Sequence, residues 1–339
     1  MALIVKPVWM QAAAATWIAL TLLWLYGNRR WSCWPRSWQD WFLPLSPALV
    51  LVVAFVAAEA GVALPINELF AAGFAGWIFL TGVWMVSVAM RDSSIMDIAY
   101  AMCTVLMTWV QWGLQGRDTS PRTLLLALIN LWGLRYTLYI AWRNLLNGGD
   151  ARCARWRGRS GSVWWWWSYI QIFVTQLVLI WLWNVPLTFG VAQAGQIGAL
   201  EIAAATIWVI GFVFEAGADW QLARLKSDPN NRGKVLTRGL WSQTFHPNYF
   251  GEAAMWLAYG LFGLAHPWGW IGAIATAYTV HMMNGGSATK MTDAHLRRKK
   301  PGYAEYAAVT PTFWPRIFGG RPRRADAVSS PAPITTSHP

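Results

Sequence analysis

The chain has 339 residues, of which 56% are hydrophobic, 12% are charged and 27 are tryptophan. The charged share is about half that of an ordinary soluble domain, which excludes a disordered chain and argues against a water-soluble globule. The net charge of +12 does not point to nucleic acid, because the basic residues do not share one amphipathic face. Cys33, Cys103 and Cys153 are widely spaced and form no CxxC pair, so neither a zinc site nor a disulfide framework is expected.

Nine apolar stretches are long enough to cross a bilayer, whose core requires about 20 apolar residues in a helix. They cover about residues 7–26, 43–64, 66–90, 95–115, 121–143, 164–189, 196–218, 243–264 and 267–284. The segments between them are mostly too short to enclose a soluble domain. The sequence therefore predicts an all-α, polytopic membrane bundle of about nine transmembrane helices, although the pairs joined near residues 64–66 and 265–267 also fit re-entrant hairpins.

Basic residues are distributed unevenly between the two sides of this bundle. The odd-numbered loops and the segment after the last stretch hold 23 of them, whereas the other side holds Lys6, Arg117 and Arg122. The positive-inside rule then places the odd loops and the C-terminus in the cytoplasm, and the net charge reflects topology and contact with membrane lipids. From about Gly319 the chain is rich in Pro, Ser and Ala and is predicted to be a disordered tail.

The densest group of polar residues lies between the seventh and eighth stretches. A loop with five basic side chains leads into the segment from His246 to Glu252; these side chains are Arg224, Lys226, Arg232, Lys234 and Arg238. If a helix starts at Pro247, Asn248 and Glu252 share one face. Such a helix start beside a basic loop suits an anion such as a cofactor phosphate. It is equally consistent with a capped helix beside an ordinary cytoplasmic loop.

Several motifs, taken in chain order, resemble a known family. They are Leu131-Trp132-Gly133-Leu134-Arg135, the spacing of Glu215, Asp219 and Gln221, Gly239-Leu240-Trp241 followed by His246-Pro247-Asn248-Tyr249-Phe250-Gly251-Glu252, and Tyr303-x-x-Tyr306 running to Thr310 and Pro315. Over about residues 90–318 this pattern resembles the C-terminal domain of steroid 5-alpha-reductases and their bacterial membrane relatives. Prenylcysteine carboxyl methyltransferases carry a similar His-Pro-x-Tyr element, and sterol C14 and C7 reductases share the general layout.

The resemblance implies an integral membrane enzyme that binds NADPH on the cytoplasmic side and passes hydride to the β-carbon of a lipophilic enone, such as a 3-oxo-Δ4 steroid entering from the bilayer. It implies a seven-helix reductase core over residues 66–318, two additional helices in residues 1–65 and a tail from 319 to 339. The cofactor contacts carried over by position or placed on the basic loop are Asp219, Arg224, Lys226, Arg238, Trp241, His246, Asn248, Tyr249, Glu252, His295, Tyr303 and Tyr306. No metal is expected, and in a bacterium the protein would lie in the inner membrane.

Three residues are candidates for the reaction itself. Asp97 opens the fourth stretch and falls near the position of a substrate-binding glutamate in the steroid enzymes, so a protonated Asp97 could donate a hydrogen bond to the enone oxygen. Arg135 on the next stretch could instead hold Asp97 ionised as a buried ion pair. Tyr136 is then the alternative donor.

Two other functions fit part of the pattern. One is a methyltransferase that uses S-adenosylmethionine on a lipid-linked acceptor, because the His-Pro-x-Tyr element is shared with such enzymes. The other is a membrane protein that binds a sterol without turnover. Consumption of NADPH separates the leading hypothesis from both.

Overall fold

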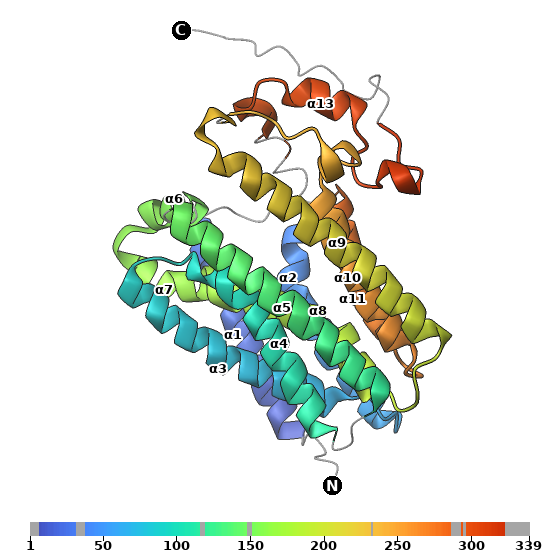
Figure 1. The fold of residues 1–339 in the computed structure, drawn as a ribbon. Helices are drawn as coiled ribbons and strands as arrows, with labels where there is room; N and C mark the ends of the chain where they lie inside the picture. Colours follow the sequence, from blue (N-terminus) through green and yellow to red (C-terminus); the bar gives the residue numbers. More distant parts are fainter. Residues whose placement is uncertain are drawn as a thin grey trace. The chain divides into compact units, whose positions relative to one another are not determined.

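The computed structural model describes residues 7–31, 38–115, 119–147, 151–231, 233–285, 293 and 296–322, and every regular element in these ranges is a helix (Figure 1). The all-α prediction is therefore confirmed. The chain divides into two compact units, one formed by Met1–Ala204 with Ala258–Thr276 and the other by Ala205–Leu257 with Ala277–Pro339.

The N-terminal half of the chain contains a run of helices in the first unit. They are α1 (Pro7–Trp31), α2 (Trp38–Glu59), α3 (Ile66–Met90), α4 (Ile95–Leu114), α5 (Ser120–Asn147), α6 (Ala151–Ser160), η1 (Gly161–Val163), α7 (Trp164–Ser168), η2 (Tyr169–Val174) and α8 (Thr175–Ala192). Each predicted apolar stretch here coincides with helical structure. The segment 144–163 was predicted as a loop, but its described residues, 144–147 and 151–163, are helical. Helix α6 continues almost directly through η1, α7 and η2 into α8.

The C-terminal half supplies the second unit and part of the first. Its helices are α9 (Ala199–Ser227), η3 (Pro229–Asn231), η4 (Gly239–Ser242), α10 (Pro247–Leu264), α11 (Trp270–Gly285), α13 (Tyr303–Val309) and η5 (Arg316–Phe318). Helices α9, α10 and α11 each contribute residues to both units. The predicted tail is described only as far as residue 322, and the rest of it lies outside the described residues.

Four helical segments among the described residues combine the length and the hydropathy of a membrane span: 66–90, 120–144, 153–192 and 199–227. Large apolar side chains such as Phe74 and Ile78 on α3 are more than half exposed. A helix that is apolar on its buried and its exposed faces is typical of a lipid environment. These long apolar helices indicate a multi-pass integral membrane protein.

Helix α8 lies at the centre of the first unit, where it packs against α2, α3, α4 and α5. Two buried hydrogen bonds join it to α4. The Gln111 Nε2 donates to Thr188 Oγ1 at 2.7 Å, and the Thr108 hydroxyl donates to Asn184 Oδ1 at 3.4 Å. Hydrogen bonds between apolar helices are a common source of association inside a membrane. These two therefore set the register of α4 on α8.

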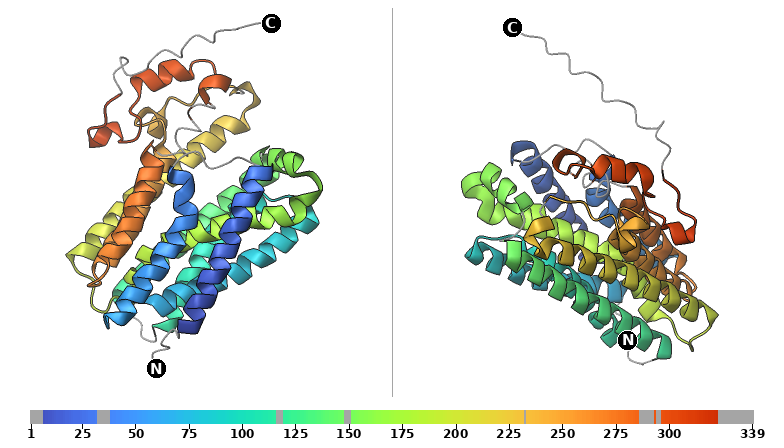
Figure 2. Two further views of the ribbon diagram at one scale, coloured as in Figure 1. Left: turned by 180° about the vertical axis from the view of Figure 1, so that it is seen from behind. Right: turned by 45° about the horizontal axis from the view of Figure 1, so that its top comes forward.

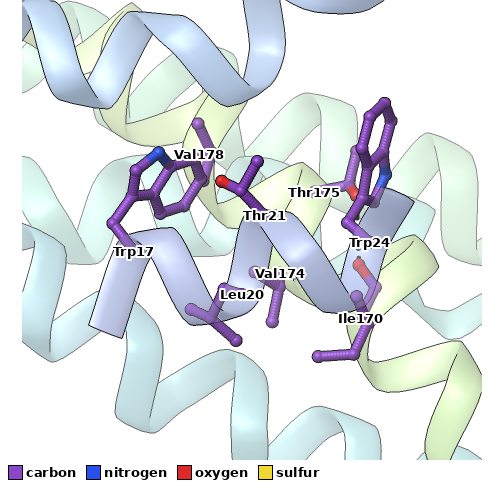
Figure 3. Close-up of a pocket in the computed structure, with 8 residues that line it drawn as sticks. All are labelled: Trp17, Leu20, Thr21, Trp24, Ile170, Val174, Thr175 and Val178. Carbon is purple, nitrogen blue, oxygen red and sulfur yellow. Dashed lines mark hydrogen bonds between the residues drawn. The ribbon is translucent and has the colours of Figure 1, made fainter. Parts of the chain in front are cut away.

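Helix α1 packs against the π-helical segment η2 that precedes α8. The view from behind shows α1 beside α2 (Figure 2). Gly27 lies directly under the buried indole of Trp167, so no larger residue fits there. A cavity of about 20 Å³, the room that one water needs, separates α1 from η2 and the start of α8 (Figure 3). The Thr175 hydroxyl donates to the carbonyl of Ile170 at 3.1 Å, as expected where a π-turn interrupts the regular helical ladder.

In the second unit, α9 and α10 run side by side and approach closely at two glycines (Figure 1). A Cβ added to Gly211 would lie 2.6 Å from the carbonyl oxygen of Gly251, and one added to Gly251 would lie 2.5 Å from that of Gly211 and closer still to the amide nitrogen of Glu215. Small residues permit this contact between helix backbones. The crossing is flanked by an aromatic core that contains Phe214, Phe250 and Phe313.

Candidate functional site

The segment before α10 is fastened to the last turns of α9. Gly239 has a φ of +64°, and a Cβ there would lie 2.7 Å from the side-chain amide of Gln221. The amide of Leu240 donates to Gln221 Oε1 at 3.1 Å, and the indole of Trp241 donates to the carbonyl of Ala218, also at 3.1 Å. The Gly239-Leu240-Trp241 motif therefore has a physical role: only glycine fits the turn that docks η4 on α9.

The same segment is fastened on its other side to the C-terminal part of the chain. The Tyr306 hydroxyl donates to the carbonyl of Trp241. The Thr244 hydroxyl donates to the carbonyl of Thr312 at 3.1 Å. The amide of Phe245 donates to the carbonyl of Pro311 at 3.0 Å. Residues 239–246, which we call the docking loop, thus have partners in both α9 and the C-terminal segment.

A buried histidine and a tyrosine meet at one carboxylate beside the docking loop. The Nε2 of His246 lies 3.1 Å from Asp293 Oδ1, and the Tyr303 hydroxyl donates to the same oxygen at 2.7 Å. Tyr249 stacks on the imidazole with ring centroids 5.1 Å apart. Sequence reasoning did not assign Asp293 to the site. The available signal was its position as the sole acid in the basic segment 290–300.

The electrostatics around Asp293 keep its carboxylate ionised, and the hydroxyls of Tyr303 and Tyr306 stay protonated. Burial alone would raise the pKa of Asp293, but hydrogen bonds from His246 and Tyr303 and the nearby Arg297 outweigh it and hold that pKa below the usual 3.8. Burial raises the pKa of Tyr303, as does its hydrogen bond to Asp293, and burial also raises that of Tyr306. Both hydroxyls therefore remain donors at neutral pH.

Acid should weaken the attachment of the C-terminal segment. Because the pKa of Asp293 is lower in the folded protein than in the unfolded chain, its stabilising contribution is complete above the ordinary value of 3.8 and is lost as the pH falls through the lowered pKa. At pH values below about 4, we expect the unfolding temperature in detergent to decrease. Asp293→Asn should remove that part of the pH dependence. Asp228→Asn, which changes an exposed carboxylate, is the matched control. An identical acid profile in both variants would contradict this role of Asp293.

Helix α10 begins at Pro247, four residues after the start of the predicted stretch 243–264, and presents Asn248 and Glu252 one turn apart. Both side chains are partly exposed, and Asn248 has no hydrogen-bond partner among the described residues. The Gly211–Gly251 crossing brings this turn against the part of α9 that carries the buried side chains of Glu215 and Asp219. An amide and three carboxyl groups therefore lie on adjacent turns of two helices.

The basic candidates lie on the surface of the same unit. Arg224, Lys226 and Arg238 are exposed, and the guanidinium of Arg224 lies 5.6 Å from the centre of the Trp220 ring. Arg232 and His295 lie outside the described residues. No three His, Cys, Asp or Glu side chains are grouped to hold a metal ion in the part of the chain that the structure describes. The chemistry that these surface residues offer is binding of an anion.

The three candidates for the reaction lie in the first unit. Asp97 is half-buried in the first turn of α4. On α5, the guanidinium of Arg135 lies 5.3 Å from the centre of the Tyr139 ring, and Tyr136 packs against Tyr100 with ring centroids 5.5 Å apart. The candidates for the cofactor all belong to the second unit. Within that unit, Tyr306 bonds to Trp241, and His246 and Tyr303 both bond to Asp293. Tyr249 stacks on His246.

Most of the chain matches a known protein family. Residues 83–310, about two thirds of the chain, match the family described as protein of unknown function, DUF1295. The chain belongs to the DUF1295 family. No curated protein matches it. The part shared with the DUF1295 family contains every predicted site residue from Asp97 to Tyr306, whereas α1 and α2 precede it.

Proposed function

We propose that the protein is a membrane reductase that uses NADPH to reduce the Δ4 double bond of a 3-oxo steroid or a similar lipophilic enone. The observation that carries the proposal is the docking loop, which is held from both sides and leads into the first turn of α10, where Asn248 lies near exposed basic residues. The sequence resemblance to steroid 5-alpha-reductases supplies the substrate class and the reaction.

The proposal includes a topology of nine spans with seven in the reductase core. The odd-numbered loops, the docking loop and the C-terminus face the cytoplasm, and in a bacterium the protein lies in the inner membrane. The support is the asymmetry of the basic residues between the two sides of the predicted spans. NADPH is a cytoplasmic cofactor, so this orientation agrees with the proposed site.

The residues present suit NADPH. Its phosphates require cations, and Arg224 and Lys226 in the last turn of α9 and Arg238 after that helix are exposed. The stretch predicted to end at residue 218 thus extends as a helix through Arg224 and Lys226. The Asn248 amide offers both donors and an acceptor, which a nicotinamide carboxamide needs. His246, Tyr303 and Tyr306 already bond to the protein, so we assign them to holding the segment that covers the cofactor.

Bound NADPH supplies a hydride for the β-carbon of the enone. Arg224, Lys226 and Arg238 would hold its phosphates, and Asn248 and Glu252 would orient its nicotinamide. A hydrogen bond from Asp97 or Tyr136 to the enone oxygen stabilises the enolate that forms, because a donor in an apolar site interacts strongly with developing negative charge. The enolate then takes up one proton at the α-carbon, which completes the reduction.

Purified protein with a 3-oxo-Δ4 steroid should oxidise NADPH and prefer it over NADH by about tenfold or more, because basic side chains recognise the additional phosphate. Lys226→Gln and Arg238→Gln should reduce that preference, whereas Lys299→Gln, which changes an exposed basic residue outside the loop, should not. Equal rates with both nucleotides would remove the phosphate role. Methyl transfer from labelled S-adenosylmethionine without NADPH oxidation, or tight steroid binding without turnover, would replace the proposal by the corresponding alternative.

Substitutions at Asp97 and Tyr136 distinguish the two candidate donors. If Asp97 donates to the enone oxygen, Asp97→Asn should lower kcat by about a hundredfold, the loss seen when one such donor is removed, while NADPH still binds. If Asp97 instead pairs with Arg135, Asp97→Asn should chiefly lower the unfolding temperature, and Tyr136→Phe should stop turnover. Full activity in both variants would place the carbonyl pocket elsewhere.

A further inference from the structure

An apolar cavity lies within the second unit, and no residue of the docking loop lines it. Its volume is about 280 Å³, and its walls come from three helices and the C-terminal segment. They include Ile207 and Ile210 of α9, Leu257 of α10, Val280 of α11, and Phe313 and Phe318. Every lining side chain is apolar. Helix α9 has the length and hydropathy of a membrane span, so the α9 wall belongs to a helix of bilayer character.

A second, polar pocket of about 460 Å³ adjoins this cavity. The two share Phe313, Trp314 and Phe318 as a common aromatic wall. On the far side of that wall the pocket is lined by Asn284 and Arg321. Arg321 is exposed and has no hydrogen-bond partner in the described ranges. The apolar cavity thus adjoins, across this shared aromatic wall, a pocket that contains a cation available to a ligand.

The aromatic wall is held by a tight turn. The amides of Phe318 and Gly320 donate to the carbonyl of Pro315 at 2.9 and 3.0 Å. The Nε of Arg316 donates to the carbonyl of Ser242 at 3.1 Å. Arg316 is therefore engaged with the protein, and Arg321 is the basic residue of this turn that faces the pocket.

We propose that these two pockets form one binding site for an anionic phospholipid, with an acyl chain in the apolar cavity and the phosphate beside Arg321. An apolar cavity in a membrane helix bundle is not filled by water, because water needs polar partners there. Lipid chains are the most abundant apolar molecules in a bilayer core. A basic side chain at the polar end favours an anionic headgroup. The exposed rings of Trp314 and Phe318 fit the headgroup level, where aromatic residues gather. The site is independent of the proposed reductase activity.

The test measures lipid binding to delipidated full-length protein in detergent by native mass spectrometry. The probes are phosphatidylglycerol, phosphatidylcholine with the same acyl chains, and soluble glycerophosphate as a competitor. We expect phosphatidylglycerol to bind more tightly than phosphatidylcholine. Arg321→Gln should lower the phosphatidylglycerol affinity about fivefold and leave phosphatidylcholine unchanged. Ala254 also lines the apolar cavity. Ala254→Phe, which fills the cavity, should lower both affinities by about tenfold or more.

Lys299→Gln is the matched control for Arg321→Gln, because it removes an exposed positive charge that lines neither pocket. Equal effects of these two variants, or equal affinities of the wild type for both lipids, would overturn the headgroup assignment. Unchanged binding in Ala254→Phe would overturn the place of the acyl chain. Competition by glycerophosphate as effective as that of the lipid would reduce the site to one for free phosphate and overturn the proposal. Arg321→Gln changes an exposed residue, so the test holds even where Ala254→Phe does not fold.

Discussion

Gly251→Ala should lower the stability of the folded protein by about 3 kcal/mol, the upper part of the usual range for overpacking. The added methyl group would meet backbone atoms of Gly211 and Glu215 at less than van der Waals distance. Backbone atoms cannot rotate away as a side chain does, so α9 and α10 would have to separate. Measured in detergent, the unfolding temperature should fall, and Gly211→Ala should act in the same direction.

The sign of the effect makes this prediction sharp. In a helix interior, glycine to alanine ordinarily stabilises by about 1 kcal/mol. Gly82 of α3 has open space around the position of a Cβ, so Gly82→Ala is the matched control and should not lower the unfolding temperature. A gain in stability from Gly251→Ala would mean that the two helices do not approach as closely as the structure has them.

Asn248→Ala should weaken NADPH binding by about a hundredfold, which corresponds to the loss of two hydrogen bonds of ordinary strength. Since Asn248 has no hydrogen-bond partner among the described residues, its removal deprives none of them of a partner. The unfolding temperature should therefore stay unchanged while nucleotide affinity falls. Fluorescence titration with NADPH and thermal unfolding of the same sample provide the two measurements.

Glu252 lies one turn after Asn248 on α10, and Glu252→Gln tests whether it contacts the cofactor or only stabilises the fold. A comparable loss of NADPH affinity without a change in the unfolding temperature would support a cofactor contact. A lower unfolding temperature with unchanged affinity would make Glu252 a structural partner only. Glu305→Gln, which changes an exposed acid on α13, is the matched control and should alter neither measurement.

The helices could be predicted from sequence because their signals are local. The predicted stretch of about 66–90 coincides with α3 (Ile66–Met90), since the segment between Pro65 and Arg91 is apolar except in its first turn, which holds Asn67 and Glu68. Helix α10 begins at Pro247, whose fixed φ suits the first helical position, and not at the start of the apolar stretch at residue 243. Helix α6 was missed because its ten residues include four arginines and no apolar run. A short polar helix gives no hydropathy signal.

The contacts of the candidate site were less predictable, because they join distant parts of the chain. The hydrogen bond between His246 and Asp293 spans 47 residues, and that between Tyr306 and Trp241 spans 65. No local pattern contains such pairs. The tyrosines were assigned to the site by resemblance, but their bonds to Asp293 and to the backbone were visible only in the structure. The close approach of α9 and α10 at Gly211 and Gly251 was likewise visible only in the structure.

The attachment of the docking loop to the C-terminal segment has a consequence for the order of synthesis. Helices α1 to α11 leave the ribosome before the residues that bond to the loop, namely Tyr306, Pro311 and Thr312. Helices can enter the membrane one by one, but the loop lacks these partners until nearly the whole chain has been made. The site is therefore completed only after α11 has been translated. A chain that ends before Tyr303 would insert its helices, but its docking loop would lack these partners.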